Sequence, residues 1–189
     1  NAEFAKARSK TLDFDMSLKE IKEKLENFVT DTALIGLEND ADLRNHKMKN
    51  MFQAHQDLID KLFCRTWISD TWNNETADDM TALLLSSTVE SNDIQLIISA
   101  VMLGGIEFYD YNKFRVLSTV YMKSTDEDIR QRALAGWVLI LQRRTYETQE
   151  MRRIVKDMLD DPRTVNELME LQIQIVYCKN AEHDRDMIQ

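Results

Sequence analysis

The chain has 189 residues and 43% hydrophobic content, which is typical of a folded globular protein and excludes a disordered one. Its four glycines and one proline are too few for the tight turns of a many-stranded β-sandwich or barrel, so long helices joined by short polar turns are expected. The formal net charge of −9 repels phosphate backbones and anionic lipid headgroups, so we expect neither nucleic acid nor a membrane as a partner.

The location and the ends of the chain can also be interpreted from composition. No apolar stretch approaches the roughly 20 residues that a transmembrane helix needs. Cys64 and Cys178 fall at apolar helical positions, which predicts free, buried thiols in a reducing, cytoplasmic compartment. The first two residues resemble a remnant of tag cleavage, and the chain ends in a charged stretch. We therefore expect a fragment of a longer protein in which residues 1–16 are a tag remnant and a flexible lead.

Two long helices are predicted to form an N-terminal pair over residues 17–72. Ser17 and Glu20 have the S-x-x-E spacing of a capping box, which predicts a helix from Ser17 to between Gly36 and Asp40. Residues 42–68 are predicted to form the second helix, with one apolar face made of Met48, Met51, Phe52, His55, Leu58, Ile59, Leu62 and Phe63. Loop residues follow at 73–76 and mark a soft boundary.

Residues 73–189 have a different pattern, in which two helices joined by a short turn form a repeated unit. The second helices of three such units begin near Ile94, Ile129 and Val165, which lie 35 and 36 residues apart. Shorter amphipathic helices are predicted before them, over residues 77–90, 112–123 and 146–160. Because neither helix of a unit can bury its apolar face alone, neighbouring units are expected to stack and to share one elongated core. We expect this core to continue into the N-terminal pair, so that the chain forms one structural domain.

One of these units, residues 117–134, resembles a HEAT repeat. An apolar first helix is followed by an acidic turn, then by Ile129-Arg130, and Ala133 stands three residues after the arginine. The resemblance implies an all-α fold in which antiparallel helix pairs form a short, right-handed HEAT-like α-solenoid, here preceded by a long-helix hairpin. In the other two units Gln95 and Asn166 stand where this repeat usually has arginine. A TPR-like or unclassified helical repeat and a single irregular bundle therefore remain alternatives.

The sequence shows no recognisable catalytic or metal-binding pattern. His46 and His55 lie nine residues apart on one predicted helix, so they point to opposite sides and cannot share a metal. His55 lies in the apolar face of that helix, where a hydrogen-bonded core or interface histidine is favoured over a ligand. Gly104-Gly105 has no Lys-Ser/Thr after it and is expected to end a helix in the left-handed conformation. We therefore expect no enzymatic activity, no cofactor and no metal.

Two groups of residues are candidates for an interaction surface. Tyr109 and Tyr111 lie in an aromatic-rich turn, where exposed rings would supply contact area at low entropic cost, although the rings could instead cover the core between units. The second group consists of Arg143, Arg144, Arg152 and Arg153. These arginines could receive an acidic or phosphorylated segment, although pairing with the glutamates between them explains the group more simply.

The sequence thus favours a non-catalytic protein-interaction or scaffold module of a larger protein, with a protein or peptide as its partner. The alternative is a helical accessory or regulatory domain of an enzyme whose catalytic part lies outside this chain. An enzyme with a pocket converging on His55 and a nucleic-acid binder with its basic residues on one face are less favoured.

Overall fold

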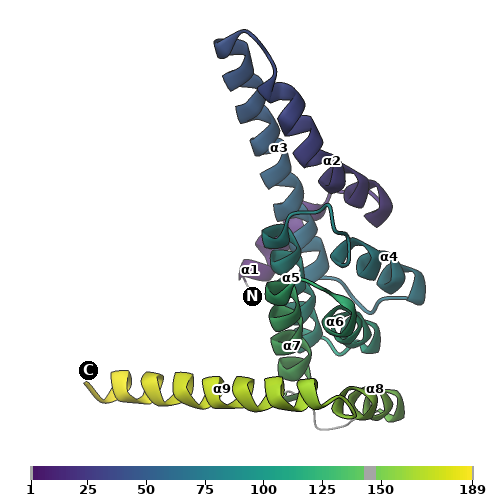
Figure 1. Ribbon diagram of the computed structural model, residues 1–189, viewed down its shortest axis with the longest axis vertical. Helices are drawn as coiled ribbons and strands as arrows, with labels where there is room; N and C mark the ends of the chain where they lie inside the picture. The colour runs from purple at the N-terminus through teal and green to yellow at the C-terminus, as the bar shows by residue number, and fades with distance from the viewer. Residues whose placement is uncertain (1, 143–147, 189) are drawn as a thin grey trace. The chain divides into compact units, whose positions relative to one another are not determined.

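The computed structural model describes residues 2–142 and 148–188, which are helical apart from the turns between helices (Figure 1). This confirms the prediction of an all-α protein. Among the described residues, no helix is both long enough and apolar enough to cross a membrane. The chain divides into two compact units, Asn1–Arg144 and Thr145–Gln189. The division falls after α7, so residues 73–76 lie within the first unit.

The first unit arranges six of its helices in two layers (Figure 1). One layer consists of α2 (Leu18–Gly36), α4 (Asn74–Leu84) and α6 (Tyr111–Lys123). The other consists of α3 (Ala41–Trp67), α5 (Ser91–Glu107) and α7 (Glu127–Gln142). The most extensive contacts join α5 with α7, α6 with α7, and α3 with α5. The long N-terminal pair therefore packs directly on the helices that follow it.

The two long helices begin at the residues that cap them. The hydroxyl of Ser17 accepts a hydrogen bond from the backbone N–H of Glu20, and the carboxylate of Glu20 accepts one from the N–H of Ser17 at 2.8 Å. This is the predicted capping box. Asp40 caps α3 by accepting from the N–H groups of Asp42 and Leu43. Helix α4 begins earlier than the predicted segment 77–90, because the Asn73 side chain caps it by accepting from the N–H of Thr76, and it ends earlier, at Leu84.

Residues 2–11 do not form the flexible lead that the sequence predicts, because Ala2–Thr11 is helix α1, which packs on α3. The Phe4 ring lies edge-on to Trp67 and Phe108, with centroid distances of 6.1 and 6.2 Å, and Ala7 is buried. Short helices are marginal in isolation, so α1 depends on aromatic contacts with residues far along the chain. Local sequence contains no sign of those contacts.

The core of the first unit lies between the two layers, around α5. Its fully buried apolar residues on α4 to α7 include Met80, Leu83, Leu84, Ile94, Ile97, Ile98, Val101, Phe114, Leu117, Val120, Leu134 and Ile140. Trp137 packs edge-on to Phe114 and lies tilted against Tyr121, with both centroid distances at 6.3 Å. Such aromatic pairs add to the hydrophobic stabilisation of the core.

Gly104 and Gly105 lie inside α5, so the prediction that they end a helix in the left-handed conformation is wrong. Helix α5 continues to Glu107, and neither glycine has a positive φ. A Cβ on Gly104 would lie 2.9 Å from the carbonyl oxygen of Trp67, and one on Gly105 would lie 2.5 Å from Cδ1 of Ile140. The two glycines therefore let α5 approach α3 on one side and α7 on the other.

A buried lysine connects α6 to the end of α3. Lys113 is fully buried, and its Nζ donates to the carbonyl oxygen of Ser69 at 2.7 Å and lies 5.5 Å from the ring centroid of Trp72. The carboxylate of Asp110 accepts from the backbone N–H of Trp72 at 2.7 Å, and Nδ2 of Asn112 donates to the Trp72 carbonyl at 2.7 Å. Burial lowers the pKa of Lys113, an effect partly offset by the negative charge of Asp110.

The second unit contains α8 (Gln149–Leu159) and α9 (Pro162–Ile188), which contact each other. Thr148 caps α8 by accepting from the N–H of Met151. The repeat pattern in the sequence extends only to about residue 177, whereas α9 continues to Ile188. At a rise of 1.5 Å per residue, α8 is about 16 Å long and α9 about 40 Å.

Alanine at position 104 should destabilise the protein, because its Cβ would overlap two backbone carbonyl oxygens rather than a movable side chain. We expect Gly104→Ala to lower the free energy of unfolding in urea by about 1–3 kcal/mol. Gly36→Ala is the matched control, because a Cβ there meets nothing within 4 Å and should add up to about 1 kcal/mol of stability. Equal effects of the two substitutions would contradict the close approach of α5 to α3.

The titration of Lys113 should make stability depend on pH in a known direction. Its pKa is lower in the folded protein than its ordinary value of 10.5, so the folded state loses the proton first as the pH rises. The cost of burying the charge then disappears while the unfolded chain still binds the proton. Between pH 7 and about 10, the free energy of unfolding of the wild type should therefore rise relative to that of Lys113→Met. Urea titrations of both proteins across this range measure the difference, and a constant difference would refute a buried charge.

Candidate functional site

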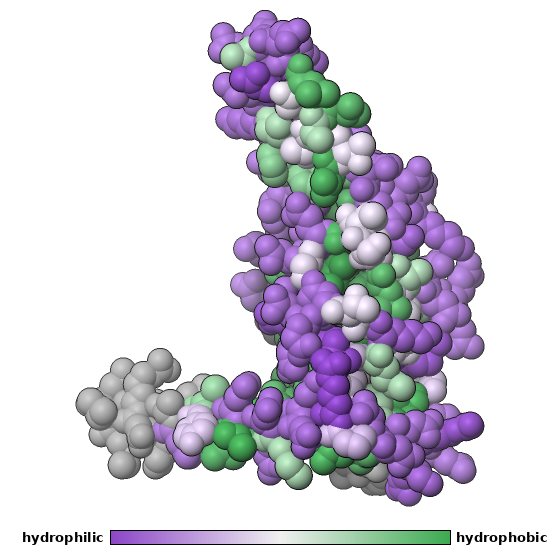
Figure 2. All heavy atoms as spheres, viewed as in Figure 1, coloured by the Kyte–Doolittle hydropathy of each residue, from purple (hydrophilic) through white to green (hydrophobic). Residues whose placement is uncertain are grey.

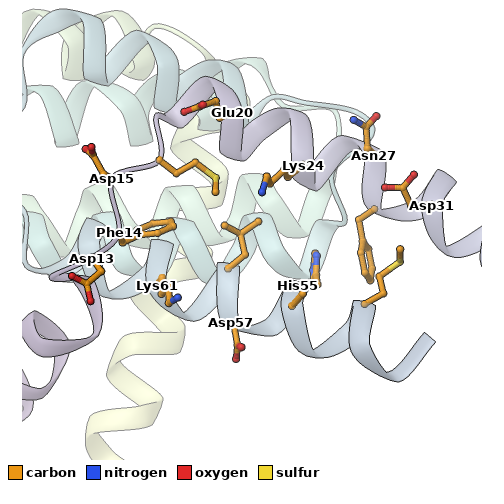
Figure 3. Close-up of a pocket in the computed structure, with 15 residues that line it drawn as sticks. Asp13, Phe14, Asp15, Glu20, Lys24, Asn27, Asp31, His55, Asp57 and Lys61 are labelled. Carbon is orange, nitrogen blue, oxygen red and sulfur yellow. The ribbon is translucent and has the colours of Figure 1, made fainter. Parts of the chain in front are cut away.

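A groove of about 820 Å³ lies between α2, α3 and the segment 12–17 that joins α1 to α2 (Figure 3). We call it the hairpin groove, because α2 and α3 form an antiparallel hairpin (Figure 1). Its apolar lining comes from all three segments and consists of Phe14, Met16, Phe28, Met51, Ala54 and Leu58. An open hollow with an apolar lining is the usual form of a binding site for another molecule.

Arg65 holds the segment 12–17 in place along one end of the hairpin groove. Its Nη1 donates to the carbonyl oxygen of Met16, and its guanidinium carbon lies 4.6 Å from the ring centroid of Phe14. Burial lowers the pKa of Arg65, and the charge of Asp15 opposes this effect. The capping box at Ser17 follows directly, so α3 and the start of α2 together hold the second half of the segment.

His55 forms part of the floor of the hairpin groove and joins this floor to α5. Its ring stacks on buried Phe28 with a centroid distance of 3.8 Å, and Phe52 lies edge-on to the same Phe28 at 5.5 Å. Nε2 of His55 lies 2.8 Å from Oδ2 of Asp93 and donates to it, since a carboxylate can only accept. His55 is thus a hydrogen-bonded interface histidine that links α3 to the first turn of α5.

The rim of the hairpin groove has an excess of negative charge. Five carboxylates line the groove, from Asp13, Asp15, Glu20, Asp31 and Asp57, against two ammonium groups, from Lys24 and Lys61. Among the residues that the structure describes, neither Asp13 nor Asp31 has an ion-pair partner. Glu20 is engaged in the capping box, which lowers its pKa through the hydrogen bonds from Ser17. The rim therefore has negative charges that no neighbouring residue neutralises.

The hairpin buries apolar residues only near its base, where it meets the other helices. Residues 29–58, all of which the structure describes, include no buried side chain. The apolar residues of this distal part that remain exposed by 42 to 77% are Val29, Leu34, Leu37, Leu43 and Phe52. In Figure 2 the same part, at the top of the view, shows hydrophobic groups among hydrophilic ones. An exposed apolar surface bordered by charge is typical of an interaction site.

Helix α9 in the second unit also has an exposed apolar face. Met169, Ile173, Val176 and Tyr177 are exposed by 50 to 71%, and their spacing of three and four residues places them along one side of the helix. Thr164 and Glu167 near the start of α9 are buried instead.

The groups capable of metal or nucleophilic chemistry are dispersed. Among the side chains that the structure describes, no three of His, Cys, Asp or Glu come close enough to hold a metal ion. Both cysteines are free. Cys64 is half-buried, and burial raises the pKa of its thiol, which disfavours the reactive thiolate. Cys178 is exposed on α9, so the prediction of buried thiols holds in part for Cys64 and is wrong for Cys178.

The structure places the sequence-predicted interaction residues in different units. Tyr109 and Tyr111 are half-buried in the first unit, on either side of buried Asp110, which caps α6 by accepting from the N–H of Asn112. Arg152 and Arg153 are exposed on α8 in the second unit. Arg143 and Arg144 lie outside the described residues. The turn that contains Tyr109 and Tyr111 is therefore part of the packing at the start of α6, and it is also partly exposed.

The hairpin groove cannot be predicted from the sequence, because the apolar lining of the groove comes from three segments. Phe14 and Met16 alternate with Asp13 and Asp15, and this alternation of apolar and acidic residues is the one local signal of a surface segment with a buried side. Arg65, whose side chain holds that segment, lies about 50 residues further along the chain. No local pattern indicates such a contact.

Scans of protein-family models, of curated proteins and of solved structures found no match to this chain.

Proposed function

We propose that this chain is a non-catalytic protein-interaction module, a short, right-handed HEAT-like solenoid that binds a protein or peptide partner through its N-terminal hairpin. The observation on which the proposal rests is the hairpin groove, an open apolar hollow with unneutralised charge on its rim. Pockets of this kind bind by covering apolar surface and select their partner through the charged groups at the edge.

The stacking of helix pairs supports the solenoid part of the proposal. Consecutive pairs contact the next pair in both layers, through α2 with α4, α4 with α6, α3 with α5, and α5 with α7. Arg130, from the unit that resembles a HEAT repeat, is buried and donates to the carbonyl oxygen of Tyr121 at 2.8 Å. Its guanidinium also lies 4.7 Å from the Tyr121 ring centroid, so the arginine joins the two helices of its own pair.

The exposed apolar residues of the distal hairpin support the interaction part. Full burial of one large apolar side chain is worth about 1.5–3 kcal/mol, so covering Leu34, Leu37 and Phe52 would provide substantial binding free energy. The basal half of the hairpin is held by α5 and α4, which leaves the distal half accessible to a partner. The surfaces at Tyr109 and Tyr111 and at Arg152 and Arg153 stay secondary proposals, since neither lies in a comparable hollow.

Site-specific photo-crosslinking tests this function. A photoreactive residue at Ala54, an exposed position in the wall of the hairpin groove, should form a covalent adduct with a discrete partner in cells that make the protein. The same residue at Glu23, exposed on α2 outside the groove, is the control and should give no such adduct. Adducts that are equal from both positions, or no adduct from position 54, would refute partner binding at this site.

A further inference from the structure

The hairpin groove has the length of a short helix. Its lining extends from Glu20 to Asp31 on α2 and from Met51 to Lys61 on α3, which at 1.5 Å per residue corresponds to about 15–17 Å on each wall. This is about three helical turns. Two antiparallel helices with an unfilled groove between them are one helix short of a three-helix bundle, and an amphipathic helix laid into such a groove is a common form of peptide recognition.

The distribution of charge selects the kind of helix. In Figure 3, Asp13, Asp15 and Glu20 lie at one end of the groove and Asp31 lies at the other. A helix with lysine or arginine near both of its ends would place a cation beside each acidic end. An acidic helix would meet repulsion at both ends, and the net charge of −9 disfavours a second copy of this chain for the same reason.

We infer that the hairpin groove binds a basic amphipathic helix of about three to four turns, with its apolar face on Phe14, Met51 and Leu58 and its cations on the acidic ends. This inference rests on the proposed function and specifies the partner for the same site. Lys24 lies between the acidic ends (Figure 3), so the middle of the bound helix should be neutral or acidic beside it. Lys61 lies at the end that carries Asp13, Asp15 and Glu20, where the carboxylates still outnumber it.

A designed peptide provides the probe. It has about 14 residues, leucine at positions i, i+3, i+4 and i+7, lysine near both ends and alanine elsewhere, with a fluorescent label for anisotropy titrations against the full chain. Two peptides serve as controls. One replaces each lysine by glutamate, and the other has the same composition in an order that removes the apolar face. We expect measurable binding of the basic amphipathic peptide alone.

Charge reversal locates the binding. Asp13→Lys with Asp31→Lys reverses one exposed carboxylate at each acidic end and should weaken binding of the basic peptide by about tenfold or more. The matched control, Glu23→Lys with Glu107→Lys, makes the same change in net charge at exposed positions outside the groove and should change binding by less than about twofold. Circular dichroism melts confirm that both double variants fold.

A steric variant tests whether the peptide occupies the hairpin groove, without any change in charge. Ala54→Trp places an indole in the groove and should also weaken binding by about tenfold, whereas Thr30→Trp, at an exposed position of α2 outside the groove, should not.

The results separate the inference from the function on which it rests. Equal weakening by the two double variants, or equal binding of all three peptides, would overturn the inference and leave the crosslinking at Ala54 to decide the function. An adduct at position 54 between two copies of this chain, or with an acidic partner, would show that the groove is a binding site but that the partner is not a basic helix.

Discussion

Two helices can approach closely only where their side chains leave room, and two adjacent glycines of α5 leave such room in this protein. Gly104 and Gly105 present bare backbone to the carbonyl oxygens at the end of α3 and to Ile140 of α7. Helix α5 therefore lies between α3 and α7 with contacts on both sides, and the rest of the core is arranged around it. Lys113 reinforces the same place by donating to the carbonyl of Ser69, just after α3 ends.

This packing holds α3 firmly only near its C-terminal end. Ile59 and Leu62 are buried there, and α1 adds an aromatic contact through Phe4 and Trp67. The hydrogen bond between His55 and Asp93 is the contact with α5 that lies furthest along α3 from this base, of those described above. Beyond it, α2 and α3 cover each other incompletely, and the apolar residues of the distal hairpin remain exposed. The hairpin groove is a consequence of this arrangement. Beyond the end of segment 12–17, no described helix of the first unit covers the groove side of the hairpin.

The sequence predicts those parts of the fold that depend on neighbouring residues. Ser17 acts on a backbone group three residues away, so the start of α2 is predicted correctly, and α3 begins within one residue of its predicted start. The role of Gly104 cannot be predicted in this way, because a glycine near a helix end and a glycine at a helix contact have the same local sequence. What distinguishes them is the carbonyl of Trp67, far away in the chain.

The candidate site is predictable to a smaller extent than the fold. The prediction that His55 is a hydrogen-bonded interface histidine is confirmed, because it falls in an apolar helical face, but its partner Asp93 cannot be identified from spacing. The acidic and apolar residues of segment 12–17 become part of a groove only because Arg65 binds the segment to α3. A contact between residues so distant in the sequence is a property of the tertiary structure alone.

Hydrogen exchange along α3 tests the central claim, that the hairpin is anchored at its base and accessible in its distal half. The amides of residues 59–67 should exchange as slowly as those of α5, through unfolding of the whole first unit. The amides of residues 43–52 should exchange through local opening and at clearly higher rates, because no buried side chain holds that part. Uniform protection along the whole of α3 would contradict the claim.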